Sequence, residues 1–282
     1  DKKNYNKTFN EEIIKKLVKK KKIRFEGVSI NSKQIKKGNL FIAIKGKNHD
    51  GHIFVKEALK NKANYCVVQK NINKLDKYKL IKFPNTISFL NKLAVLKRNH
   101  INAKVIAITG SSGKTTLKTL IGKTLNEYGK TYFSQKSYNN HIGVPLSLCN
   151  LENDHKYGVF EIGMSNKGEI KRLSSLVKPD IAIITNIGEA HIENFDNLKG
   201  IAKAKSEIIE NINKSGYLIL NRDDKYFNYL SKLGKKRKIN VSSFGLSSSA
   251  DAKLIKNRLY KNYNHLQFRV LNKNIHLKVK NI

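Results

Sequence analysis

The stretch VIAITGSSGKTTLKTLIGKTL, from Val105 to Leu125, decides how the rest of the chain is interpreted. It starts with a short apolar run, passes through a turn of glycines and serines, and continues with leucines and isoleucines at helical spacing. A strand, a loop and a helix in this order are the setting of a phosphate-binding loop, because backbone N–H groups and a helix N-terminus favour an anion. The usual pattern has a glycine five residues before the Gly-Lys pair, where this chain has Ile108. The stretch therefore predicts a phosphate site with a shortened loop.

The residue types of the loop suggest individual roles. Lys114 would reach the outer phosphates, and the hydroxyl of Thr115 would meet a magnesium ion. The residues expected to contact the nucleotide here are Gly110, Ser111, Ser112, Gly113, Lys114, Thr115 and Thr116. A Gly-Lys-Thr-Thr run can also be a chance helix start, and the loop alone does not separate a kinase, a GTPase or a ligase.

Apolar strands and helices alternate along the chain after this loop. YGVFEIG, DIAIITNIG and GYLILN are typical of buried strands, and GEIKRLSSLV and GIAKAKSEIIENI are typical of helices. This alternation predicts an α/β fold of the P-loop NTPase type, with a mostly parallel sheet flanked by helices. After about Ser242 the pattern changes to short alternating strands, which predicts a C-terminal antiparallel meander.

The first hundred residues show a different sequence pattern. Short β-branched runs separated by glycines predict a small α/β domain. A chain of 282 residues is long enough for two domains of ordinary size. We therefore expect an N-terminal domain over residues 1–100 and a central nucleotide-binding domain over residues 101–282.

The formal net charge of +35 raises the possibility of a nucleic-acid partner. Lysine dominates the cations and accompanies many asparagines and isoleucines, three residues that share A/T-rich codons. The lysines are spread along the whole chain, and arginine, the preferred reader of phosphates and guanines, is scarce. We therefore expect no specific nucleic-acid partner, and a basic nucleic-acid-binding module stays an alternative from another functional class.

Cys66 and Cys149 lie too far apart for a zinc motif and are expected to be buried thiols. The longest apolar runs are too short to cross a bilayer, and the first residues lack the apolar core of a signal peptide. These features predict a cytoplasmic protein without a membrane partner, and we expect a monomer.

Further motifs stand at the ends of successive predicted strands, where open α/β sheets bind their ligands. They are YNNHIGVP (138–145), FEIGMSNKGEI (160–170), ITNIGEAHIENF (184–195), IAKAKSEI (201–208) and LNRDD (220–224). In this order behind TGSSGKTT they resemble the ATP-dependent Mur ligase family of cell-wall synthesis, whose own phosphate loop has the short form T-G-x-x-G-K-T-T. N-N-x-I-G-V-P and E-x-G-M-x-x-x-G-E-I are most similar to the member that joins D-alanyl-D-alanine to UDP-N-acetylmuramoyl-tripeptide.

The resemblance implies an ATP-dependent ligase of peptidoglycan synthesis, and hence a role in cell shape and division. ATP would convert the terminal carboxylate of the tripeptide to an acyl phosphate, which the amine of D-alanyl-D-alanine then attacks. Such chemistry brings anions together and needs charge neutralisation, for which the family uses Mg²⁺ at two sites. The alternatives within the family are the ligase that adds the third amino acid and folylpolyglutamate synthase. A P-loop phosphotransferase is a further rival.

The resemblance also assigns roles to residues outside the loop. Glu161 would bind Mg²⁺ beside Thr115, and His191 would bind a second metal ion. Of two lysines on one helix, the family pattern A-K-x-E-I selects Lys205 rather than Lys203 as the lysine that CO₂ carbamylates and that then acts near the second metal. Lys114, Lys205 and His191 are thus the expected catalytic residues. Asn221 and Asp223 are expected to hold adenine and ribose. Asn139 and Asn140 are expected to orient the phosphate or substrate loop.

The N-terminal stretch GNLFIAIKGKNHDGHIFVKEAL resembles the UDP-sugar domain of the family. Its expected substrate-binding residues are Ser32, Lys45, Asp50, Gly51 and His52. The family usually has Asp-Ser-Arg where this chain has Asn31, Ser32 and Lys33, and an asparagine where it has Ser137. The resemblance covers about residues 23–282, and relatives have three domains. We therefore expect the central domain to be incomplete at its C-terminal end, the amino-acid-binding domain to be absent, and the chain alone to be unable to complete ligation.

Overall fold

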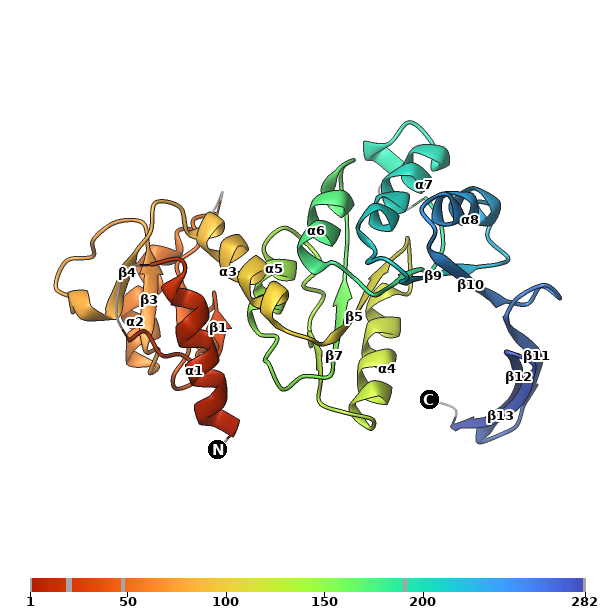
Figure 1. The fold of residues 1–282 in the computed structure, drawn as a ribbon, viewed down its shortest axis with the longest axis horizontal. Coiled ribbons are helices and arrows are strands. Elements are labelled where there is room, and N and C mark those ends of the chain that lie inside the picture. Colours follow the sequence, from red (N-terminus) through yellow and green to blue (C-terminus); the bar gives the residue numbers. More distant parts are fainter. Residues whose placement is uncertain (1, 19–21, 47–48, 190–191, 281–282) are drawn as a thin grey trace. The chain divides into compact units, whose positions relative to one another are not determined.

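The computed structural model describes residues 2–18, 22–46, 49–189 and 192–280 (Figure 1). By its contacts the chain divides into two compact units. The first contains residues 1–104 and 119–160, and the second contains residues 105–118 and 161–282. The division therefore falls twice inside regular elements, in helix α4 (Lys114–Asn126) and at the end of strand β7 (Tyr157–Glu161). Within the described ranges, no helix has the length and apolar character needed to span a membrane.

The first unit contains a small parallel sheet in the order β1-β2-β3-β4. Its strands are β1 (Val28–Ser29), β2 (Leu40–Ile42), β3 (Tyr65–Val68) and β4 (Leu80–Lys82). The helical elements of this part of the chain are α1 (Lys2–Lys15), η1 (Ser32–Gln34), η2 (Gly51–Phe54), α2 (Val55–Lys60), η3 (Lys77–Lys79) and α3 (Thr86–His100). One core cluster joins the sheet to α2 and includes Phe41, Val55, Ala58 and Cys66, so the first thiol is buried as predicted.

The first unit also holds strand β6 (Thr131–Phe133), which pairs in parallel with β7. Helix α5 (Gly143–Cys149) packs against α3, and all seven of its residues are buried. Cys149, the second thiol, is among them. Burial raises the pKa of each cysteine to about 12, so both thiols are inert at neutral pH.

The second unit is built on neighbouring strands in the order β13-β12-β11-β10-β9-β8-β5. These strands are β5 (Lys104–Thr109), β8 (Ile181–Ile184), β9 (Tyr217–Asn221), β10 (Asn240–Gly245), β11 (Ala252–Leu259), β12 (Tyr263–Val270) and β13 (Lys273–Lys280). Pairing from β5 to β11 is parallel, and β11, β12 and β13 form the antiparallel meander. The expected α/β class and meander are confirmed.

The helical elements of the second unit are the start of α4, α6 (Glu169–Val177), η4 (Ile192–Asn194), α7 (Leu198–Ser206), η5 (Glu207–Asn211) and α8 (Phe227–Lys236) (Figure 1). Strands β5 and β8 are almost wholly buried, which explains why their sequences are continuous apolar runs rather than alternating ones. Ile108, at the position where the usual loop has glycine, is a fully buried residue of β5. The phosphate loop therefore begins two residues later, at Gly110.

Candidate nucleotide site

The loop from Gly110 to Gly113 joins β5 to α4 in the predicted strand–loop–helix order. Gly110 has φ +148°, and a Cβ atom there would lie 1.8 Å from Oγ1 of Thr185. Gly113 has φ +76° and open space around it, so only its backbone conformation demands glycine. The two positions therefore require glycine for different reasons. At Gly110 a side chain would collide with Thr185, and at Gly113 the backbone is left-handed.

Lys114 is the first residue of α4 and its ammonium group folds back over the loop. Nζ donates hydrogen bonds to the carbonyl oxygens of Gly110, at 2.7 Å, and Ser111, at 3.3 Å. Burial lowers the pKa of Lys114, and the charge of Glu161 partly offsets that effect. The cation is therefore held at the loop, at the position from which a lysine reaches phosphate oxygens.

Glu161 ends β7 with its carboxylate aimed at the start of α4. The side chain is 2% exposed, and Oε2 accepts a hydrogen bond of 2.8 Å from Oγ1 of Thr115. The N–H of Ile162 donates to the carbonyl of Ile108 at 2.8 Å, which fixes this strand end beside β5. A buried carboxylate and a hydroxyl in contact are hard oxygen donors of the kind that Mg²⁺ prefers, so these residues fit a magnesium ion.

Lys118 also lies beside Glu161, and the sequence analysis did not identify it as a site residue. It lies one helical turn after Lys114, is fully buried, and places Nζ 4.0 Å from Oε2 of Glu161. Burial lowers its pKa, with a smaller opposite effect from Glu161. The i, i+4 spacing from Lys114 was the available signal, but in so lysine-rich a chain it did not stand out.

The structure separates the two lysines of α7 clearly. Lys205 is 2% exposed, whereas Lys203 is exposed. Burial, with a smaller contribution from the charge of Lys114, lowers the pKa of Lys205 to about 7. An amine of this kind is largely neutral just above neutral pH, which is the state that reacts with CO₂.

The other predicted residues of the second unit are only partly described. His191 lies outside the described residues, so its predicted metal role stays a prediction. Asn221 ends β9, and its Oδ1 accepts a hydrogen bond from the N–H of Asp223 at 3.0 Å. The Asp223 carboxylate accepts from the N–H groups of Leu246, at 2.6 Å, and Ser247, at 2.9 Å. Asp223 thus already organises the loop after β10, and its predicted ribose role is untested.

Asn139 and Asn140 belong to the first unit. Oδ1 of Asn140 accepts from the N–H of Ile142, at 3.1 Å, and of Gly143, at 2.9 Å, so this side chain orders the entry to α5. The N–H of Asn139 donates to the carbonyl of Ser137 at 3.0 Å. Both asparagines shape a loop, and their predicted role toward phosphate or substrate stays a prediction.

The expected substrate residues of the first unit are tied closely into its fold. His52 is buried, its Nδ1 lies 2.5 Å from Oδ1 of Asp50, and its Nε2 accepts from the N–H of Gln69 at 2.9 Å. Two hydrogen bonds from His52 lower the pKa of Asp50. The bond from the backbone N–H has the larger effect and the bond from the ring the smaller one. Lys45 forms an isolated β-bridge with Asp50.

Gly51 and Ser32 are also explained by local contacts. A Cβ on Gly51 would lie 2.7 Å from the carbonyl oxygen of Ile44, which leaves room only for glycine. The Ser32 hydroxyl donates to Glu57 at 2.7 Å. Oδ1 of Asn31, where the family usually has Asp, still accepts from the N–H of Lys33 at 3.0 Å and begins η1. The amide therefore preserves this turn, although the carboxylate charge is absent.

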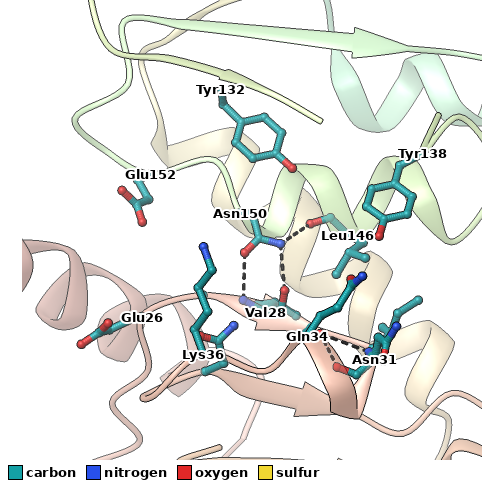
Figure 2. A pocket seen from close by; sticks show the side chains of 14 residues that line it. Glu26, Val28, Asn31, Gln34, Lys36, Tyr132, Tyr138, Leu146, Asn150 and Glu152 are labelled. Atoms are coloured by element: carbon teal, nitrogen blue, oxygen red, sulfur yellow. Dashed lines mark hydrogen bonds between the residues drawn. The ribbon is translucent and has the colours of Figure 1, made fainter. Parts of the chain in front are cut away.

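A cavity of about 340 Å³ lies within the first unit between the β1 segment and α5 (Figure 2). Polar side chains from Asn31, Lys36, Tyr138 and Glu152 line it. Asn150, at the end of α5, connects this helix to β1. Its Oδ1 accepts from the N–H of Val28 and its Nδ2 donates to the Val28 carbonyl, both at 2.9 Å. Asn31 and Tyr138 stand next to residues predicted to bind substrate, which makes this cavity the candidate substrate pocket of the first unit.

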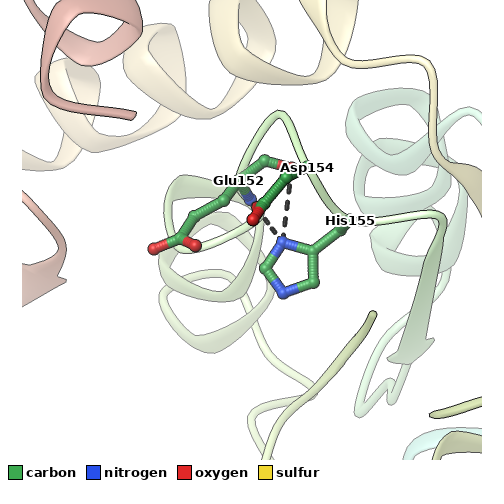
Figure 3. Close-up of side chains that lie close together, drawn as sticks. All are labelled: Glu152, Asp154 and His155. Atoms are coloured by element: carbon green, nitrogen blue, oxygen red, sulfur yellow. Dashed lines mark hydrogen bonds between the residues drawn. The ribbon is translucent and has the colours of Figure 1, made fainter. Parts of the chain in front are cut away.

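Glu152, Asp154 and His155 gather close enough to suggest a second metal centre (Figure 3). Lys130 already pairs with both carboxylates, since its Nζ lies 2.6 Å from Oε2 of Glu152 and 2.8 Å from Oδ1 of Asp154. Nδ1 of His155 accepts from the backbone N–H of Glu152 at 2.9 Å. The group is therefore accounted for as an ion-pair network around one lysine.

Comparison with known proteins shows the family of the chain. The model of the Mur ligase middle domain matches residues 108–281, and that of the Mur ligase family catalytic domain matches residues 24–98. The chain is 40% identical over 253 residues to the UDP-N-acetylmuramoyl-tripeptide–D-alanyl-D-alanine ligase of Rickettsia prowazekii, covering 89% of this chain and 56% of that protein. It is 34% identical over 216 residues to the ligase of the same name from Escherichia coli, covering 76% and 47%.

Solved structures give the same result. MurF from Acinetobacter baumannii superposes with a TM-score of 0.81 at 27% identity, covering 96% of this chain and 60% of that one. MurF ligase from Thermotoga maritima in complex with ADP superposes with a TM-score of 0.75 at 28% identity, covering 89% and 57%. The chain thus spans about half the length of the curated relatives it matches. It belongs to the Mur ligase family.

Proposed function

We propose that the chain carries the ATP-binding and UDP-sugar-binding parts of a ligase that joins D-alanyl-D-alanine to UDP-N-acetylmuramoyl-tripeptide. Residues 1–100 would serve the sugar nucleotide and residues 101–282 the ATP. The observation that carries the proposal is the group around the phosphate loop. Thr115 and Glu161 are in contact, Lys114 folds over the loop, and the buried Lys205 has a pKa lowered by burial and by Lys114. The names of the relatives support this choice of reaction.

In the proposed reaction, ATP transfers its γ-phosphoryl group to the terminal carboxylate of the tripeptide and leaves as ADP. The amine of D-alanyl-D-alanine then attacks the acyl carbon, the new amide bond forms, the amine loses a proton, and phosphate leaves. Lys114 would exchange the carbonyl oxygens of Gly110 and Ser111 for phosphate oxygens. Thr115 and Glu161 would hold Mg²⁺, which neutralises the charge of the phosphates when bound. Positioning and charge neutralisation supply the rate enhancement.

Lys205 is proposed to be carbamylated. Its neutral amine adds to CO₂, a C–N bond forms and one proton is released, so that the neutral amine becomes an anionic carbamate. The carbamate would attract the neighbouring ammonium group of Lys114, which in the unmodified protein disfavours a charge on Lys205. This anion, together with His191, is proposed to serve the second metal ion.

The test compares two lysines on one helix. The chain is incubated with ¹³C-labelled bicarbonate, and the carbamate signal is followed by NMR in the wild type, Lys205→Ala and Lys203→Ala. We expect the signal to disappear only in Lys205→Ala, because Lys203 is exposed. Equal signals in the two variants would contradict the assignment of the carbamate.

The reaction itself is tested in the complete gene product. ATP hydrolysis should require UDP-N-acetylmuramoyl-tripeptide and D-alanyl-D-alanine together. A free diamino acid with the UDP-linked dipeptide should not replace them. Activity with the latter pair would favour the ligase of the third amino acid. Binding of MgADP to the 282-residue chain, lost in Lys114→Ala, would test the nucleotide site separately.

A further inference from the structure

The segment after β8, residues 185–188, lies against the phosphate loop and is joined to it by several hydrogen bonds. Oγ1 of Thr185 donates to the carbonyl of Ser112 at 2.7 Å. The Ser111 hydroxyl donates to the carbonyl of Gly188 at 2.9 Å and accepts from the N–H of Gly188 at 2.8 Å. Both segments belong to the second unit, so these contacts form within one compact body.

Asn186 makes the central contacts of this junction. Its Oδ1 accepts from the N–H of Ser112 at 3.0 Å and from the N–H of Ser111 at 3.2 Å. Its Nδ2 donates to the hydroxyl of Ser112 at 2.8 Å, and its backbone carbonyl accepts from the N–H of Ser111 at 3.0 Å. One side chain therefore engages both serines of the loop, from a strand end more than seventy residues away in sequence.

The geometry explains how a shortened loop keeps a defined shape. A phosphate loop presents successive backbone N–H groups, and each group keeps one direction only when an acceptor holds it. Here the first two N–H groups after Gly110, those of Ser111 and Ser112, donate to Asn186, which fixes the direction of this part of the loop. Thr185 closes the same side, because its hydroxyl fills the space that a side chain at Gly110 would need.

We propose that Asn186 is a positioning residue that holds the shortened phosphate loop in its nucleotide-binding shape before the nucleotide arrives. Binding then costs less, since the loop does not have to be ordered in the same step. The inference rests on the proposed nucleotide site, and the contacts between Asn186 and the two serines carry it. Asn186 acts through its contacts with Ser111 and Ser112 rather than on a reacting group.

Two substitutions separate geometry from charge. Asn186→Ala removes both the acceptor and the donor of the side chain. Asn186→Asp keeps acceptor oxygens for the two N–H groups but adds a negative charge beside the phosphates. Asn213→Ala is the matched control. Asn213 is half-buried in the same unit, and its Nδ2 donates to the Lys178 carbonyl and to Asp180, both at 3.2 Å, away from the loop.

The first readout is amide hydrogen exchange of the nucleotide-free chain, resolved by NMR. In Asn186→Ala the amide of Ser112 should exchange about tenfold faster, since it loses its acceptor. The amide of Ser111 should change less, because the backbone carbonyl of Asn186 still accepts from it. Asn186→Asp should keep the protection of Ser112, and Asn213→Ala should leave both amides unchanged. Unchanged exchange of Ser112 in Asn186→Ala would overturn the proposal.

The second readout is the dissociation constant of MgADP, measured by calorimetry on the same proteins. We expect Asn186→Ala to weaken binding about tenfold, Asn186→Asp to weaken it further, and Asn213→Ala to leave it within about twofold. Wild-type affinity in Asn186→Ala would overturn the positioning role. If the wild-type chain itself bound no MgADP, the proposed function would be contradicted, while exchange at Ser112 would still decide whether Asn186 holds the loop.

Discussion

Lys97 is a fully buried lysine in the first unit, and its burial should make the free energy of unfolding depend on pH. The side chain is fully buried on α3, donates from Nζ to the carbonyl of Cys149 at 2.8 Å, and lies 5.9 Å from the ring centroid of Phe9. Burial lowers its pKa from 10.5 to about 8, and Cys149 and Glu152 act weakly in the opposite direction. The pKa of Cys149 is about 12, so the thiol stays protonated throughout the relevant range.

The sign follows from proton binding. Between pH 8 and 10.5 the unfolded chain keeps a proton on this amine and the folded chain releases it, so the free energy of unfolding rises with pH. The full difference of 10.5 − 8 = 2.5 pKa units corresponds to about 3 kcal/mol of destabilisation below pH 8. Roughly 2 to 3 kcal/mol of it should be recovered between pH 7 and pH 10.

Lys97→Met removes this titration and keeps an apolar chain of similar length. Urea unfolding at pH 7 and pH 10 should show wild-type stability rising relative to that of Lys97→Met by roughly 2 to 3 kcal/mol. Comparing variants cancels the other groups that titrate in this range. Lys92→Met, an exposed position on the same helix, is the control and should follow the wild type. Parallel curves for wild type and Lys97→Met would refute the claim that burial depresses this pKa.

Three further substitutions test particular contacts. Gly110→Ala should destabilise the chain by at least about 2 kcal/mol and abolish MgADP binding, because its Cβ would collide with Thr185; a normal melting temperature would contradict this. Asn150→Ala should cost about 2 kcal/mol in urea unfolding, since both backbone groups of Val28 lose their partner, and an unchanged midpoint would refute it. Glu161→Gln should weaken Mn²⁺ binding in the presence of ADP about tenfold by electron paramagnetic resonance, whereas unaltered Mn²⁺ affinity would remove this carboxylate from the metal site.

The phosphate loop shows how far local sequence information reaches. A buried strand, a glycine turn and a helix start are encoded within some twenty neighbouring residues, so their order could be predicted and is confirmed. The reason why Gly110 must be glycine could not be predicted, because the obstructing hydroxyl belongs to Thr185. Asn186 was overlooked for the same reason, since nothing in its own neighbourhood indicates that it faces Ser112.

The lysines show the opposite limit. In a chain with 56 lysines and arginines, residue type alone carries almost no information about function. Resemblance to a family singled out Lys205, and burial distinguishes it physically from Lys203. Lys97 and Lys118 went unnoticed although both are fully buried, because desolvation depends on what packs around an amine rather than on its own position in a helix.

By itself, the sequence determined the α/β class, the shortened phosphate loop and the family, because these depend on short-range periodicity and on motifs in a fixed order. The tertiary structure decided which charges are desolvated and which backbone groups are held across the sheet. It placed Glu161 against Thr115, and it brought Asn186 to the backbone of Ser112. Parallel strands align their carboxyl ends at one edge of the sheet, and so residues distant in sequence meet there. Burial and hydrogen bonding at that edge are properties of the assembled sheet and of no single segment.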